Sequence, residues 1–212
     1  MKTLEVYAGT QSFSKAVIRD NKDNSTTTVD ILKKFNPTIV ADVLDWDYKK
    51  LFKEGEFDMV WCSPPCNNYS KAKTTGVRNL ELADSLVRKA FEIIDYLKPK
   101  VWLVENVGTG LLVKRMESIR PGLTSRFVDY CPYGRPTRKR TIIWSNIPFD
   151  FKLCAGVGRC EQMVDKHHKA SCGSARRRDG TPWEIQLNNC WERDLIPEPL
   201  VDYIVEETKK YI

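Results

Sequence analysis

Residues Phe57-Asp-Met-Val-Trp-Cys-Ser-Pro-Pro-Cys-Asn-Asn-Tyr-Ser70 join a short apolar run to a polar loop through two consecutive prolines. The run up to Trp61 is typical of a buried strand, and each proline fixes its own φ and restricts the residue before it. We therefore expect a stiff turn that presents Cys66 at the carboxyl end of a strand, where open α/β sheets bind ligands. A thiol placed there is a candidate nucleophile, although a buried free cysteine beside a proline turn would explain the same residues.

Other apolar runs of the chain also end in polar side chains. The first leads into Gly9 and an amphipathic helix, which is the strand, turn and helix order of a nucleotide-binding unit. The next two end at Asp30 and Asp42, and Val101-Trp-Leu-Val104 is followed by Glu105. Because parallel strands end at the same edge of a sheet, this pattern predicts an α/β fold with a mostly parallel, doubly wound sheet. The two aspartates could also simply end their strands.

The remaining periodic segments complete this layout. Apolar residues at helical spacing predict a helix over Leu80 to Leu97, which Pro99 stops. Thr124 to Tyr130 and Arg140 to Trp144 read as a closing pair of strands. The end of the chain predicts a helix with Leu200, Ile204 and Val205 on its buried face.

Composition limits the class of protein. The chain has 212 residues, an ordinary hydrophobic fraction of 42% and a net charge of +6, which suits one α/β domain and is compatible with a polyanionic partner. Seven cysteines without the spacing of a small secreted scaffold indicate reduced thiols. No signal peptide or membrane span is recognisable, so we expect a cytoplasmic or nuclear protein that is not secreted and has no membrane partner.

Four stretches resemble, in order, signature motifs of the DNA cytosine-5 methyltransferases. They are Tyr7-Ala-Gly9, Ser63-Pro-Pro-Cys66 with Tyr69-Ser70, Glu105-Asn-Val107, and Tyr133-Gly-Arg-Pro-Thr-Arg-Lys-Arg140. The resemblance covers roughly the first two thirds of the chain and looks most like the small enzymes of phages and large DNA viruses. It implies a Rossmann-like fold, S-adenosylmethionine as the methyl donor, and a cytosine flipped out of double-stranded DNA.

The chemistry of this reaction accounts for the residue types. Cytosine C5 becomes a nucleophile only after a thiolate adds to C6, and Cys66 would be that thiolate, with a pKa lowered by nearby arginines and backbone N–H groups. Glu105 would hold N3 and read the exocyclic amine. The resemblance further implies that Arg138 and Arg140 stabilise the thiolate and clamp the Cys66 loop or a target phosphate.

The resemblance also implies a cofactor site at the sheet edge. Backbone groups near Gly9 would hold the methionine portion, Asp30 the ribose hydroxyls, and Asp42 the adenine amine. The residues expected to contact S-adenosylmethionine are Tyr7, Ala8, Gly9, Thr10, Asp30, Asp42, Val43, Pro64 and Leu86. Leu86 would belong to the core in any case. Gln11 and Ser12 stand where the family usually has glycines, which could reshape this turn.

A polar loop from Asn67 to Arg78 would close over the extruded base from the groove side. The residues expected to contact DNA are Asn67, Tyr69, Ser70, Lys71, Lys73, Arg78, Asn106, Arg176 and Arg177. Asn106 would in addition brace the Cys66 loop. The arginine run could instead be a solvated face of the protein.

Composition changes after residue 145. We expect a catalytic and cofactor-binding domain over residues 1–145, a small irregular recognition segment over 146–190, and a helix over 191–212 that returns to the catalytic domain. The middle segment contains Cys154, Cys160, His168 and Cys172, a set that could bind structural zinc in a segment too small to build its own core. Unliganded loop cysteines are the alternative.

These features predict a monomeric DNA cytosine-5 methyltransferase. So small a recognition segment reads few bases, so we expect a short target of about two to four base pairs. Two other functions stay open. One is methylation of cytosine in transfer RNA, which one branch of the family performs. The other is a catalytically silent relative that binds nucleic acid, although Cys66, Glu105, Arg138 and Arg140 together argue against it.

Overall fold

A seven-stranded sheet of order β3-β2-β1-β4-β5-β7-β6 forms the centre of the computed structural model, which describes residues 1–172, 176–187, 192 and 194–212. The strands are β1 (Lys2–Val6), β2 (Ser25–Asp30), β3 (Ile39–Val40), β4 (Met59–Cys62), β5 (Val101–Val107), β6 (Ser125–Asp129) and β7 (Arg140–Ser145). Strands β1 to β5 run parallel, whereas β7 is antiparallel to both of its neighbours. The predicted, mostly parallel α/β sheet is confirmed.

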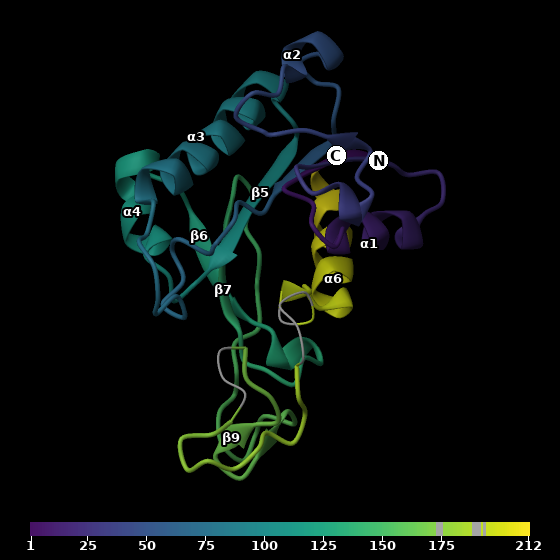
Figure 1. Ribbon diagram of the computed structural model, residues 1–212. Helices are drawn as coiled ribbons and strands as arrows, with labels where there is room; N and C mark the ends of the chain where they lie inside the picture. Colours follow the sequence, from purple (N-terminus) through teal and green to yellow (C-terminus); the bar gives the residue numbers. More distant parts are fainter. Residues whose placement is uncertain (173–175, 188–191, 193) are drawn as a thin grey trace.

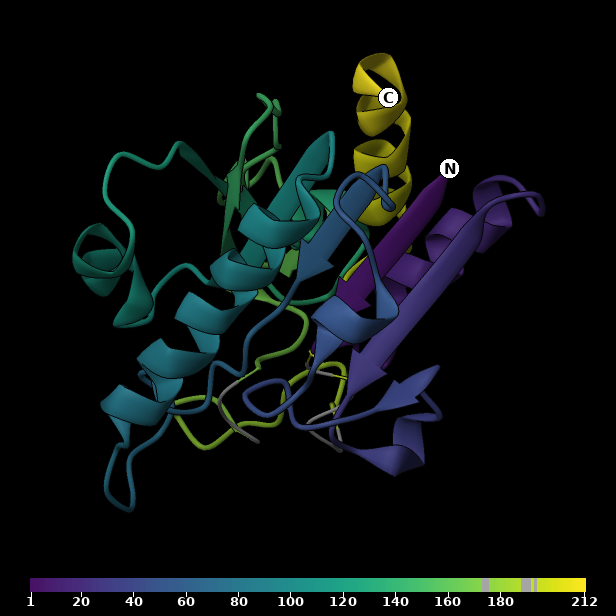
Figure 2. The same ribbon diagram turned by 90° about the horizontal axis from the view of Figure 1, so that it is seen from above.

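Helices cover both faces of this sheet (Figure 1). They are α1 (Ser12–Asp20), α2 (Tyr48–Leu51), α3 (Leu80–Leu97), α4 (Leu112–Ile119) and α6 (Glu198–Thr208), with short 3₁₀ turns η1 (Lys33–Phe35), η2 (Cys131–Tyr133) and η3 (Lys209–Tyr211). Helices α3 and α4 pack in one apolar cluster, and α1 and α6 pack in the other. Figure 2 shows the sheet between the two helical layers. The fold is therefore doubly wound.

The strand before Cys66 explains why both layers are needed. In β4, Met59 and Trp61 pack in the cluster of α1 and α6, whereas Val60 and Cys62 pack in the cluster of α3. All four side chains are fully buried, and the Trp61 ring stacks on Phe13 with a centroid distance of 5.2 Å. A strand covered on both faces needs a continuous apolar run, which is what the sequence has here.

Helix α3 has the bounds predicted from its periodicity. The side chain of Asn79 caps its start by accepting a hydrogen bond from the Leu82 N–H at 3.0 Å. Lys98 adopts a left-handed conformation at its end, and Pro99 follows. Strand β3, in the run that ends at Asp42, is only two residues long, and both of them pair with β2.

The segment after β7 divides into two parts. Ile147, Phe149 and Phe151 remain in the catalytic core, and Phe149 stacks on Phe151. Between residues 152 and 187, Ala170 is the single buried residue among those that the structure describes. This part forms the lower end of Figure 1 and contains a hairpin of β8 (Met163–Val164) and β9 (His167–His168). The predicted division at residues 190 and 191 lies outside the described residues.

None of the helices in the described ranges is both long and apolar enough to cross a membrane.

Two isoleucines test the packing of the helical layer formed by α1 and α6. Ile204 is fully buried, whereas Ile18 of α1 is 39% exposed. Ile204→Ala should therefore lower the free energy of unfolding by about 2–4 kcal/mol, because it deletes buried methyl groups and leaves a cavity. Ile18→Ala should change it by less than about 0.5 kcal/mol. Urea unfolding followed by circular dichroism measures both, and equal losses would contradict this packing.

Candidate active site

A cleft of about 450 Å³ lies where the parallel strands end, and it gathers the predicted cofactor residues with two of the predicted catalytic ones. Its lining includes Tyr7, Ala8, Gly9, Thr10, Asp30, Asp42, Val43, Pro64 and Leu86, together with Cys66 and Glu105. The other lining residues are Glu5, Ser12, Ile31, Leu32, Phe35, Leu44, Ser63, Pro65, Leu82, Val107, Lys139, Asp194 and Ile196. Its volume and its mostly apolar walls are those of a small-molecule site.

The turn after β1 forms one wall of the cleft. Tyr7, Gly9 and Gln11 all have positive φ values, of 60°, 44° and 58°. Only Gly9 adopts such a conformation without steric cost. Gln11, which stands where glycine was expected, is held by two hydrogen bonds that its side-chain amide donates to the carbonyls of Phe35 and Asn36. These bonds offset the strain, so the tight turn survives without a second glycine.

The two strand-end aspartates have different surroundings. Asp30 is 8% exposed, and its two carboxylate oxygens accept hydrogen bonds from the Gly9 and Leu32 N–H groups, both at 2.8 Å. Asp42 is exposed and accepts a bond from the Leu44 N–H at 3.0 Å. Asp30 therefore fixes the turn at Gly9, and both carboxylates face the cleft.

The Cys66 turn is held from behind by a buried amide. Asn106 is 1% exposed, and its Nδ2 donates a hydrogen bond of 2.8 Å to the Pro64 carbonyl. The Cys66 carbonyl accepts bonds from the Tyr69 and Ser70 N–H groups. Asn106 therefore braces the turn, as its motif implied. A buried side chain cannot touch DNA, so the expectation that Asn106 contacts DNA is corrected.

Burial raises the pKa of the Cys66 thiol to about 11, the opposite of the lowering that we expected. The positive charge of Lys139 acts in the other direction, and Glu105 adds to the rise. Without a bound substrate the thiol is therefore protonated at neutral pH.

Glu105 lies within β5, which continues to Val107 because its last residues pair with β7. Burial raises the pKa of Glu105, and Lys139 opposes the rise. The Tyr130 hydroxyl lies 3.4 Å from Glu105 Oε1. A carboxyl group that is kept protonated can donate a hydrogen bond, which a carboxylate cannot do.

Arg138 and Arg140 are not beside Cys66. Arg140 Nη2 lies 2.7 Å and Arg138 Nε 3.2 Å from Oδ2 of Asp129, a fully buried carboxylate. Neither arginine lines the cleft. In this structure both guanidinium groups pair with the buried charge of Asp129 rather than with the thiol, and their clamp on the Cys66 loop or a target phosphate stays a prediction.

Lys139 is the cation that sequence analysis missed. It lines the cleft with Cys66 and Glu105, its side chain is 14% exposed, and its Nζ lies 3.4 Å from Asp194 Oδ1. Lys139 has a positive φ of 21°, so the chain is not extended between the two arginines that bind Asp129, and Lys139 lines the cleft instead. No pattern in the sequence signals this direction.

The loop between Asn67 and Arg78 is closed by its own cations. Lys73 Nζ donates to Asn68 Oδ1 and to the Val77 carbonyl, and Arg78 donates to the carbonyls of Asn68 and Lys73. Asn67 and Lys71 are exposed, Ser70 is half-buried, and Val77 is 92% exposed. These side chains form the accessible surface of the loop.

Tyr69 is fully buried, and its hydroxyl donates a hydrogen bond of 2.8 Å to Asp84. The expected DNA contact of Tyr69 is therefore wrong, because its ring anchors the loop in the core. Arg176 is exposed and Arg177 half-buried, with the Arg177 guanidinium 5.4 Å from the centre of the Trp183 ring. Their contact with DNA stays a prediction.

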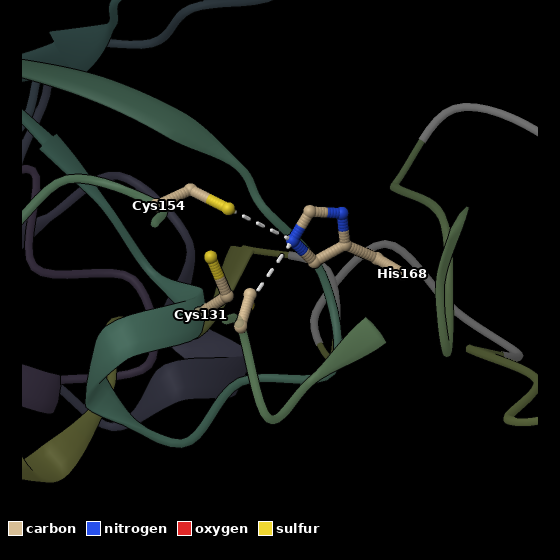
Figure 3. A group of neighbouring side chains, drawn as sticks. Cys131, Cys154 and His168 are labelled. Atoms are coloured by element: carbon tan, nitrogen blue, oxygen red, sulfur yellow. Dashed lines mark hydrogen bonds between the residues drawn. The ribbon is translucent and has the colours of Figure 1, made fainter. Parts of the chain in front are cut away.

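Three of the four predicted metal ligands come together, and Figure 3 shows two of them, Cys154 and His168, beside Cys131. The ligand atoms of Cys154, Cys160 and His168 lie within 4.8 Å of one another and of the Cys131 thiol. Among the described residues, Cys131 completes this group, and Cys172 is not part of it. Cys131 was missed because it lies in the arginine-rich connection, far from the other three in sequence.

Comparison with known proteins identifies the family. Residues 8–129 match the C-5 cytosine-specific DNA methylases. The chain is 36% identical over 203 residues to the "Probable DNA (cytosine-5)-methyltransferase" of Frog virus 3 (isolate Goorha), which covers 85% of this chain and 91% of that relative. The chain therefore belongs to the C-5 cytosine-specific DNA methylase family.

Two solved structures share the fold. One, from E. coli, is a candidate DNA modification methyltransferase encoded within a prophage, with a TM-score of 0.53, 16% identity, and coverage of 68% of this chain and 46% of that one. The other is the Entamoeba histolytica methyltransferase EhMeth, with a TM-score of 0.51, 18% identity, and coverage of 81% and 57%. The chain thus spans about half the length of both, and the methyltransferase-type fold is confirmed.

Glu5 is a second residue of the cleft that sequence analysis missed, and its titration is testable. Burial raises its pKa to about 7, although its Oε2 accepts a hydrogen bond from the Ser14 N–H. The unfolded chain ionises Glu5 near pH 4.5, so stability falls as pH rises through 7. Glu5→Gln should therefore match wild type at pH 4 and be more stable at pH 8, by about 3 kcal/mol at most.

Urea unfolding at both pH values measures this difference. Glu56→Gln is the control, and it should change stability in the opposite direction. Hydrogen bonds from Lys2 and Lys53 lower the pKa of Glu56, so removing this carboxylate should destabilise the protein at pH 8. A Glu5→Gln variant with an unchanged pH dependence would contradict the burial of a protonated Glu5.

Proposed function

We propose that this protein transfers a methyl group from S-adenosylmethionine to C5 of a cytosine that is flipped out of double-stranded DNA. The observation that carries the proposal is the single cleft that Cys66 and Glu105 share with all nine expected cofactor residues. A nucleophile, a proton donor and a nucleoside site within one cavity are what this reaction needs.

The cleft suits the cofactor in its donors as well as in size. Asp30 and Asp42 offer carboxylates for ribose hydroxyls and an adenine amine, and Val43 and Leu86 offer apolar walls. The backbone turn at Gly9 leaves room for the amino-acid end, since no atom lies within 4 Å of where a Cβ would stand. When bound, S-adenosylmethionine supplies an electrophilic methyl group on a sulfonium.

The chain's own residues prepare the cytosine. The Cys66 thiol gives its proton to solvent and its sulfur bonds to C6, so that electrons of the C5–C6 double bond move toward N3. Glu105 donates a hydrogen bond or a proton to N3, for which its raised pKa suits it. Carbon 5 then carries the nucleophilic electron pair. After C5 has been methylated, transfer of its proton to water restores the double bond and releases the Cys66 sulfur as a thiolate.

Lys139 supports the thiolate in this proposal. Cys66 reacts as a thiolate, yet burial raises its pKa, and Lys139 is the first of the charges that lower it. A cation held in the cleft by Asp194 thus favours the reactive form.

DNA would approach through the accessible surface of the loop. Asn67, Ser70 and Lys71 face solvent there, and Val77 offers an apolar tip of the kind that proteins insert between bases. The net charge of +6 favours the phosphate backbone. Methylation of transfer RNA is the second candidate, since neither the cleft nor the charge distinguishes the two polymers.

The covalent step can be trapped with duplex DNA that contains 5-fluorocytosine. Fluorine at C5 cannot leave as a cation, so the enzyme should stay bonded to the base in a denaturant-resistant complex. Wild type should form the complex in the presence of S-adenosylmethionine, and Cys66→Ser should form none. Gel electrophoresis after denaturation measures it.

Cys62→Ala is the matched control, because Cys62 is fully buried in β4 and should be dispensable for trapping. A complex that forms equally well with Cys66→Ser would overturn the mechanism. Parallel labelling of DNA and transfer RNA with tritiated cofactor decides between the two substrates.

The pH dependence of trapping tests Lys139. Below the raised pKa of Cys66 the rate of complex formation should rise about tenfold per pH unit as the thiolate fraction grows. Lys139→Met should raise that pKa further and slow trapping at pH 7.5 by about tenfold, which one unit of pKa produces. Lys139→Arg should restore most of the rate.

Arg138→Met provides the contrast, because the Arg138 side chain is half exposed and bound to Asp129. Its pH profile should keep the wild-type shape. A profile that shifts with Arg138→Met but not with Lys139→Met would return the role to the arginines.

A further inference from the structure

Four potential metal ligands meet at one point between the catalytic sheet and the small segment below it. They are the thiols of Cys131, Cys154 and Cys160 and the imidazole of His168, with ligand atoms that all lie within 4.8 Å of one another. The three cysteines are free, with no disulfide between them. Figure 3 shows the His168 ring nitrogen directed toward the thiols.

The distances fit a tetrahedral zinc site. Bonds of about 2.3 Å to sulfur and about 2.0–2.1 Å to nitrogen, at the tetrahedral angle, place sulfur and nitrogen about 3.6 Å apart. His168 Nε2 lies 3.5 Å from Cys154 Sγ and 3.7 Å from Cys160 Sγ. Three cysteines and one histidine are also a common donor set of structural zinc.

The chain around these ligands is shaped to bring them together. Gly156 and Gly158 have φ values of 85° and 76°, so the backbone between Cys154 and Cys160 can turn twice within five residues. The Cys160 N–H donates to the Gly156 carbonyl at 3.0 Å and fixes this turn. The β8–β9 hairpin then returns the chain to His168.

The charges around the cluster complement a bound metal. One Zn²⁺ with three thiolates and a neutral imidazole carries a net charge of −1. Asp129 accepts the Cys154 N–H at 2.9 Å and also binds Arg138 and Arg140, so two guanidinium groups lie beside the cluster. Asp129 thereby orients a ligand-bearing backbone and brings the compensating cations.

The segment that supplies three of the ligands has little else to hold it. Among its described residues from 152 to 187, Ala170 is the single buried one, and the hairpin pairs only two residues with two. A segment without a core needs another source of stability, which a structural metal supplies.

We propose that Cys131, Cys154, Cys160 and His168 bind one zinc ion, which fastens the segment from 152 to 187 to the catalytic sheet. Cys131 lies in η2, directly after β6, so the metal would join the segment to the sheet rather than only close a loop. The site differs from the set expected from sequence in that Cys131 replaces Cys172.

Two adjacent histidines give a matched test on the full-length protein, purified without chelators or a histidine tag. Mass spectrometry of the metal should find about one zinc ion per chain in wild type. His168→Ala should lose it, whereas His167→Ala should keep it, because His167 is exposed and its ring contacts Trp183. Zinc-free wild type would overturn the proposal, as would equal zinc in both variants.

Cys131→Ser and Cys172→Ser test the ligand set in the same way. Cys131→Ser should lose zinc and Cys172→Ser should retain it, and the reverse result would overturn the assignment of Cys131. If Cys131→Ser does not fold, wild type and Cys172→Ser are loaded with cobalt in place of zinc. Their absorption spectra then show whether Cys172 is a ligand. Three thiolate ligands give a strong sulfur-to-cobalt charge-transfer band, which should be equal in both proteins and should disappear on adding zinc. None of these readouts depends on methylation, so failure here leaves the proposed function standing.

Discussion

The buried carboxylate of Asp129 is the constraint on which the arginine motif and the start of the small segment from 152 to 187 depend. It is fully buried, and hydrogen bonds from Arg140 and the Cys154 backbone keep its pKa low although burial opposes this. An unpaired buried charge would cost several kcal/mol, so the two arginines are held in place by electrostatics. Lys139 stands between them with a positive φ of 21° and lines the cleft. Both sequence neighbours of this cation are thus held by an acid that lies outside the cleft.

The same carboxylate ties three parts of the chain together. It ends β6, it orients the start of β7, and it accepts the backbone of Cys154 at the entrance to the small segment. The cleft, the sheet and the segment therefore share one buried hub.

Sequence predicted those features that depend on local periodicity. Helix α3 has its predicted bounds, and the antiparallel closing strands and the buried face of α6 are confirmed. The nine residues that the family resemblance implied for the cofactor line one cleft, as expected where the strand ends of a parallel sheet share one edge. Local sequence patterns therefore sufficed to predict the fold, and with the family resemblance they predicted eleven residues that line the cleft.

What sequence missed depends on contacts between distant residues. The ring of Tyr69 enters the core only because Asp84 of α3 receives its hydroxyl, which no spacing predicts. The Cys66 thiol has a raised pKa because the folded chain buries it. Cys131 joins the other thiols because η2 and the segment meet in space. Each of these is a property of the folded chain, in which burial and long-range partners outweigh the local pattern.

The packing of α6 against α1 has a consequence for biosynthesis. These two helices lie at opposite ends of the chain and cover the same face of the sheet, and Figure 1 shows both termini close together. Phe13 and Val17 thus emerge from the ribosome long before Leu200 and Ile204, their partners in this layer. Until α6 has been translated, only α1 of these two helices covers this face of the nascent sheet, and the apolar surface that stays exposed favours aggregation. Helix α6 therefore completes this helical layer late in translation, and before that chaperones can bind the exposed apolar surface.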